Sequence, residues 1–142
     1  MSILKRVGKT TVESMLSNYI HSAPDYSVIV IDADPQKSFT RMRKLDLSKG
    51  HEEENLFNIV TIPAIDVEKK IKNIVPEYDL IFIDLPGDLY EAGVMNCYKL
   101  AYHVFVPTNV TTQDLTATND LSKAASRILH PYGERTIWRS AL

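Results

Sequence analysis

Four short apolar runs are the most regular feature of the chain. Each is rich in β-branched or aromatic residues, lacks polar alternation, and ends near a proline or an aspartate. A strand that is apolar on both sides has to be covered on both faces, as strands of parallel sheets are. The runs therefore predict four buried strands, at residues 28–31, 58–62, 80–83 and 103–106.

Segments with helical spacing lie between these runs. One apolar stripe predicts a helix that ends by Pro24, and a second predicts a helix over residues 67–75 between an Asp66 cap and Pro76. A third segment, which begins at Thr111 or Thr112, predicts a long helix that ends near His130. The first stripe consists of Val12, Met15, Leu16, Tyr19 and Ile20.

The alternation of strands and helices sets the expected fold class. It predicts an α/β protein with a doubly wound, mostly parallel sheet and helices on both faces. Ligands of such sheets bind beyond the carboxyl ends of the strands. A length of 142 residues fits a single domain, 1–142. Residues 44–55 lack a regular pattern and predict a solvated loop, and residues 131–142 predict an irregular tail.

Composition and charge narrow the functional classes. The formal net charge is -2, so no global basic field is available to hold nucleic acid. The single cysteine, Cys97, cannot form an intrachain disulfide or a multi-thiolate metal site, and we interpret it as a core residue. No apolar run approaches the roughly 20 residues that span a bilayer, and the first residues lack a signal-peptide core. We therefore expect a cytoplasmic protein without a membrane span.

A phosphate-binding pattern opens the first predicted helix. Gly8, Lys9, Thr10 and Thr11 run directly into it, which places backbone N–H groups and the positive end of the helix dipole where phosphate oxygens bind. Lys9 would reach the β- and γ-phosphates, and the Thr10 hydroxyl would ligate Mg²⁺. A full P-loop pattern also has a glycine five residues before Gly8, where this chain has Ile3. A basic helix cap is the alternative interpretation.

Acidic residues follow two of the predicted strands. Asp32 and Asp34 come at the end of the 28–31 run, and Asp84 ends the 80–83 run. The carboxyl ends of parallel strands meet at one edge, so these carboxylates are expected beside the phosphate loop. P-loop enzymes hold their metal with an acid at such a strand tip. Taken singly, each could instead be a turn former at a strand end.

Together these elements resemble the ParA-type partition ATPases, the deviant Walker A group of P-loop proteins that includes MinD-like relatives. Residues 7–11 are similar to the end of the family's phosphate loop, and residues 28–36 to its strand that ends in Asp-x-Asp-Pro-Gln. Residues 78–86 are similar to its Tyr-Asp-hydrophobic-Asp-x-Pro segment, and residues 103–123 to its next strand and long helix. The resemblance covers most of residues 4–129.

The resemblance implies that the chain binds ATP and Mg²⁺ and hydrolyses ATP slowly. Gly8, Lys9, Thr10 and Thr11 would bind phosphate. Thr10 and Asp84 would hold Mg²⁺, with Asp32 supporting the metal shell, while Asp34 would position the attacking water. The resemblance also implies an ATP-dependent homodimer, nonspecific DNA binding and a ParB-like activator, in plasmid or mobile-element partition or maintenance.

The chain departs from the family pattern at several positions. The two loop glycines of the family fall on Lys5 and Arg6, its signature lysine falls on Leu4, and the strand that precedes the loop is absent. We therefore expect an incomplete sheet, truncated at both ends. One alternative is a degenerate, non-hydrolysing P-loop module that acts through dimer or partner contacts. Another is a different deviant Walker A enzyme, such as an ATP-dependent amide or biotin-precursor synthase.

Overall fold

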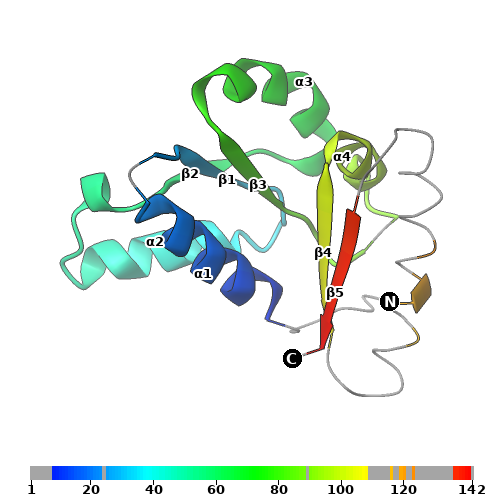
Figure 1. Cartoon of the computed structure of the whole chain (residues 1–142), viewed down its shortest axis with the longest axis horizontal. Helices are drawn as coiled ribbons and strands as arrows, with labels where there is room; N and C mark the ends of the chain where they lie inside the picture. Colours follow the sequence, from blue (N-terminus) through cyan, green and yellow to red (C-terminus); the bar gives the residue numbers. More distant parts are fainter. Residues whose placement is uncertain are drawn as a thin grey trace.

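The computed structural model describes residues 8–23, 25–88, 90–108, 116, 119–120, 123 and 136–141. Helices and strands alternate along most of this part of the chain (Figure 1). Two single turns of 3-10 helix, η1 (Glu53–Asn55) and η2 (Val75–Glu77), interrupt the connections. The main elements are α1 (Lys9–His21), β1 (Val28–Asp32), α2 (Ser38–Ser48), β2 (Asn58–Thr61), α3 (Ala64–Ile74), β3 (Leu80–Asp84), α4 (Val94–Leu100), β4 (His103–Thr108) and β5 (Thr136–Ala141).

All four predicted strands are present, and every strand pairing in the described residues is parallel. Three strands form one sheet in the order β2-β1-β3, and β4 pairs with β5 in a second sheet. The middle strand, β1, is buried along its whole length. Its continuous apolar sequence is explained by this position, because both of its faces and both of its edges are covered.

Helices cover both faces of the three-stranded sheet. Val30 of β1 packs with Phe39 of α2 and with Phe57, on the side that carries α1 and α2. Ile31, the next residue, belongs to a larger core on the opposite side, where Figure 1 shows α3 and α4. Consecutive side chains of a strand point to opposite faces, so this alternation divides the core between two layers of helices.

The two sheets share a core but are not hydrogen-bonded to each other. Val104 and Val106 of β4 pack in the same cluster as Ile31 and beside Ile83 of β3. Within the described part of the chain, however, β3 and β4 belong to different sheets. In the described residues the strands are therefore interrupted between β3 and β4.

Two predictions about local structure are wrong. Residues 44–48 were predicted as loop but belong to α2, which continues until the Lys49 N–H bonds to the Leu45 and Asp46 carbonyls and the chain turns at Gly50, where φ is 89°. Asp66 was predicted as the cap of the next helix but lies in the first turn of α3, because Pro63 precedes the helix start.

The predicted irregular tail is also wrong for part of its length. Thr136–Ala141 form β5, which pairs in parallel with all of β4. This segment has no apolar alternation in its sequence, and its strand structure comes from backbone pairing with β4. The rest of the tail, and nearly all of the predicted helix after Thr111, lie outside the described residues, as do residues 1–7. No described helix has the length and apolar character needed to cross a membrane.

Candidate functional site

The site lies where two neighbouring strands end. β1 and β3 are adjacent and in register, so that Asp32 pairs with Asp84, and neither residue is exposed to solvent. The chain runs from β1 to β2 on one side of β1 and then returns to β3 on its other side. A reversal of this kind between adjacent parallel strands is where open α/β sheets bind their ligands.

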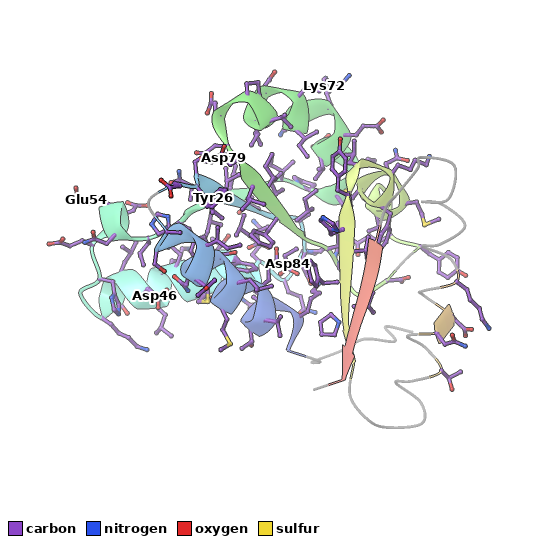
Figure 2. All side chains as sticks on the ribbon, viewed as in Figure 1. Tyr26, Asp46, Glu54, Lys72, Asp79 and Asp84 are labelled. Atoms are coloured by element: carbon purple, nitrogen blue, oxygen red, sulfur yellow. The ribbon has the colours of Figure 1, made fainter. Side chains whose placement is uncertain are left out.

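Lys9 and Thr10 bring the start of α1 to this edge. The Nζ atom of Lys9 lies 2.9 Å from Oδ1 of Asp84 and 3.5 Å from Oδ2 of Asp34. The Thr10 hydroxyl donates a hydrogen bond of 3.0 Å to Oδ2 of Asp84. Asp84 itself lies at the end of β3 in the interior of the fold (Figure 2). Four of the residues singled out from the sequence therefore meet at one point.

Gly8 and Thr11 complete the start of the helix. Gly8 has a φ of 70°, in the left-handed region, and its carbonyl accepts the Val12 N–H. A glycine adopts this conformation at little cost, so it can start α1 directly above the strand ends. Thr11 is exposed on the outer side of the same turn. The positive end of the helix dipole faces the strand ends, where phosphate would bind.

The rotation of α1 about its axis differs from what its apolar stripe suggests. Met15 and Tyr19 are 68% and 79% exposed, whereas Ser14 and Ser17 are buried, and Val12, Leu16 and Ile20 are half-buried. Lys9 and Thr10 both contact Asp84 of β3, so the first turn of the helix directs polar side chains toward the sheet. The apolar stripe therefore only partly coincides with the buried side of α1.

Asp34 is held by the turn that follows β1. Its Oδ1 accepts the Gln36 N–H at 2.8 Å, and its carbonyl accepts the Lys37 N–H at 2.8 Å. Lys37 has a φ of 50°, which is unusual for a residue other than glycine. The turn leaves Oδ2 of Asp34 free to face Lys9. Asp34 is thus fixed at the border of the site, with its side chain 14% exposed.

Asp32 has a different set of contacts from the other acids. Its Oδ2 accepts both the backbone N–H and the hydroxyl of Thr40, each at 3.0 Å. The Thr40 hydroxyl also lies 2.9 Å from that of Thr61 at the end of β2. Asp32 therefore anchors the first turn of α2 to the sheet. Its Oδ1 is buried without a hydrogen-bond partner in the described residues.

Glu13 is a charged residue near the site that the sequence analysis missed. It lies one helical turn after Lys9, and its Oε1 is buried with no hydrogen-bond partner among the described residues. Burial, followed by the negative charges of Asp84 and Asp32, raises the pKa of Glu13 well above its usual value, and Lys9 opposes this effect. Burial also raises the pKa of Asp84, against the opposing charge of Lys9. The sequence signal that could have identified Glu13 is its spacing of four residues from Lys9, which places both side chains on one face of the helix.

The oxygen atoms at this edge suit Mg²⁺ bound together with phosphate. A hydroxyl from Thr10 and a carboxylate from Asp84 are hard ligands of the kind Mg²⁺ prefers. The described residues contain no group of three or more His, Cys, Asp or Glu side chains that could hold a metal ion alone. Mg²⁺ commonly binds through one or two carboxylates plus substrate phosphates. The site fits a cation that arrives with a nucleotide.

Comparison with known proteins gave matches only at the level of structure. No protein-family model matches the chain, and no curated protein is significantly similar to it in sequence.

Several solved structures share the fold over nearly the whole chain. Apo McdA from Cyanothece is 18% identical with a TM-score of 0.72, over 99% of this chain and 69% of that one. A plasmid partition protein from Borrelia burgdorferi is 18% identical with a TM-score of 0.71, over 97% and 74%. Cobyrinic acid a,c-diamide synthase from Mycobacterium smegmatis is 14% identical with a TM-score of 0.70, over 96% and 69%.

These similarities establish the fold. The predicted α/β class, with a mostly parallel sheet and helices on both faces, is confirmed by the strand pairing and by the solved structures that share it. Plasmid partition proteins are among those structures, as the sequence resemblance led us to expect.

Proposed function

We propose that the chain is a ParA-like protein that binds ATP with Mg²⁺ at the carboxyl ends of β1 and β3. The observation that carries this proposal is the meeting of Lys9 and Thr10 with Asp84 and Asp34. It joins a phosphate-binding helix start to the acids that a magnesium nucleotide requires. A basic helix cap alone would not need a buried acid beneath it.

Each residue then has a distinct role. Lys9 and the N–H groups at the start of α1 bind the phosphates, and the left-handed Gly8 directs these groups toward them. Thr10 and Asp84 hold Mg²⁺, which neutralises charge on the phosphates, while Asp32 supports this arrangement through α2. Asp34 orients the water that attacks the terminal phosphate. Positioning and charge neutralisation supply most of the catalysis in phosphoryl transfer.

Ligands named for the similar structures support this choice of nucleotide and cation. The M. smegmatis synthase is described with bound ADP and magnesium, a B. burgdorferi partition protein with AMPPNP, and a McdA variant with ATP. We extend the proposal to slow ATP hydrolysis by a cytoplasmic, ATP-dependent homodimer in plasmid or mobile-element partition. Nonspecific DNA and a ParB-like activator are its proposed partners.

A second candidate function is a nucleotide-binding scaffold without hydrolysis. It is favoured by the long side chains of Lys5 and Arg6 at the two positions where the family has loop glycines. Such a protein would act through dimer or partner contacts. A small-molecule synthase is a further alternative, because the fold is shared with an amide synthase. DNA binding that depends on ATP would favour partition over the synthase.

Phosphate release separates the enzyme from the scaffold. Hydrolysis should be measured with and without Mg²⁺ and DNA for the wild type, for Lys9→Ala and for Lys72→Ala, an exposed lysine of α3 that serves as the control. We expect slow, Mg²⁺-dependent turnover that persists in the control and is lost in Lys9→Ala. A wild type without Mg²⁺-dependent turnover, even with DNA, would leave the scaffold as the function.

A further inference from the structure

The Asp32 side chain is held through only one of its two carboxylate oxygens. Its Oδ2 accepts the backbone N–H and the hydroxyl of Thr40, each at 3.0 Å. Its Oδ1 is buried and has no hydrogen-bond partner among the described residues. Both donors come from one residue in the first turn of α2 and reach the same oxygen atom. The orientation of the carboxylate, and with it the position of Oδ1, therefore depends on Thr40.

The hydroxyl of Thr40 is itself oriented by a second threonine. Its Oγ1 lies 2.9 Å from Oγ1 of Thr61, at the end of β2. A hydroxyl carries one hydrogen, and Thr40 donates this hydrogen to the carboxylate of Asp32. The bond between the two threonines is then donated by Thr61. The result is a directed chain of hydrogen bonds that runs from β2 through α2 and ends on β1.

The Asp32 side chain lies on the side of the sheet that carries the proposed nucleotide site. Asp32 follows Val30 by two residues, and alternate side chains of a strand share one face, here the face of α1 and α2. Asp84 is the register partner of Asp32 on β3. Lys9 and Thr10 contact Asp84 from α1. A buried acceptor without a partner is costly, so Oδ1 is explained by a ligand better than by stability.

We propose that Thr40 is a positioning residue for phosphoryl transfer, because it fixes the Asp32 carboxylate so that Oδ1 accepts a hydrogen bond from a water molecule beside the nucleotide phosphates. This inference rests on the proposed function and goes beyond it, since Thr40 acts through Asp32 and not by contact with the nucleotide. A fixed acceptor needs no reorientation as the reaction proceeds, so its contribution is largest in the transition state. Thr40 therefore affects the transferring state more than nucleotide binding.

The test measures equilibrium binding of ADP with Mg²⁺, without and with aluminium fluoride, which beside ADP mimics the phosphoryl group in transfer. The gain in affinity from aluminium fluoride reports how well the site fits the transition state. Thr40→Val keeps the backbone N–H and nearly the same shape but lacks the hydroxyl. We expect wild-type affinity for ADP and a gain at least about tenfold smaller, because a hydrogen bond to a charged group is lost. Thr40→Ser keeps the hydroxyl and should restore the gain to within about threefold.

Two further variants control the measurement. Ser48→Ala removes a hydroxyl at the other end of α2, where it donates to the Leu45 carbonyl, and should bind both ligands as the wild type does. Thr61→Val removes the donor that orients Thr40, at an exposed strand end, and should reduce the gain by at least about threefold. Circular dichroism and thermal unfolding establish that each variant is folded. A purely structural role of Thr40 would lower the unfolding temperature without changing the gain.

The outcomes distinguish this inference from the function on which it rests. Absence of ADP binding by the wild type would overturn the proposed function, and the inference with it. ADP binding without a gain from aluminium fluoride in the wild type, or with a gain that falls less than about tenfold in folded Thr40→Val, would overturn the inference and leave nucleotide binding intact. Failure of Thr40→Ser to restore the gain would do the same. If Thr40→Val does not fold, Thr61→Val decides: a gain reduced by at least about threefold supports the inference, and a smaller reduction overturns it.

Discussion

Buried charge is the main feature of this protein at the scale of single residues. Asp32 and Asp84 are fully buried at the ends of adjacent strands, and Glu13 lies close to both. Lys9 is the cation that pairs with this group in the described residues. Buried carboxylates without enough partners destabilise a fold, so their presence at one edge is explained by a ligand better than by stability.

Glu13→Gln tests the burial of charge beside the site. A carboxyl whose pKa is raised in the folded state contributes stability below its unfolded pKa, near 4.5, and loses that contribution as pH rises through the folded value. The variant has no charge to bury. Its free energy of unfolding should therefore exceed that of the wild type by at least about 1 kcal/mol at pH 8, and by less at pH 5.

Urea unfolding of both proteins between pH 5 and pH 8 measures this difference. Glu77→Gln, at an exposed position, should match the wild type throughout. A difference between Glu13→Gln and the wild type that stays constant with pH would show that Glu13 is not a buried ionisable group.

Cys97 gives a second prediction at this scale. Its side chain is 1% exposed, and burial, together with the charge of Glu68, raises the pKa of the thiol to about 11. A thiol that is both buried and protonated is unreactive. Labelling with a thiol reagent at pH 8 should be negligible in the native protein and complete after unfolding in urea. Rapid native labelling would contradict the core position of Cys97.

At the scale of elements, the close contact of α3 and α4 depends on a single glycine. A Cβ atom at Gly93 would lie 2.3 Å from the backbone N and Cα of Ile65, and φ at this position is 89°. Gly93→Ala should lower the free energy of unfolding by about 2–4 kcal/mol. Gly50 has the same φ with no atom within 4 Å, so Gly50→Ala should cost only about 1–2 kcal/mol. Equal losses in urea unfolding would contradict the close approach of the helices.

The orientation of α1 can be tested with one substitution at two positions. Tyr19→Gln lies on the exposed side and should change the free energy of unfolding by no more than about 0.5 kcal/mol. Ser17→Gln adds volume at a fully buried position and should cost about 1–3 kcal/mol. The reverse order of the two effects would mean that the apolar stripe of α1 faces the sheet.

The sequence was sufficient to predict the strands whose apolar pattern results from burial on both faces. β1 and β3 are continuous apolar runs because both faces are covered, and such runs are visible without a structure. The rotation of α1 could not be predicted from its apolar stripe, because Ser14 and Ser17 are buried while Met15 and Tyr19 of the stripe are exposed. β5 could not be predicted either, because its pairing with β4 depends on backbone hydrogen bonds between distant segments.

At the scale of the whole molecule, the site occupies one edge of the three-stranded sheet, and the break lies beside it. β3 carries Asp84 and also borders the break from β4. The common location of Asp32 and Asp84 at strand ends, with Asp34 in the turn after β1, was predictable from the sequence, because parallel strands end at a common edge. The separate contacts of these acids could not be predicted, because the contact of Asp32 with Thr40 depends on where α2 lies.

Calorimetric titration with ATP in the presence of Mg²⁺ tests the central claim, that the start of α1 and the acid of β3 form one nucleotide site. The wild type and the Lys72→Ala control should bind saturably and equally, and Lys9→Ala should bind at least about tenfold more weakly, because a charge-assisted contact to phosphate is lost. No saturable binding by the wild type, or equal binding by Lys9→Ala, would contradict the account.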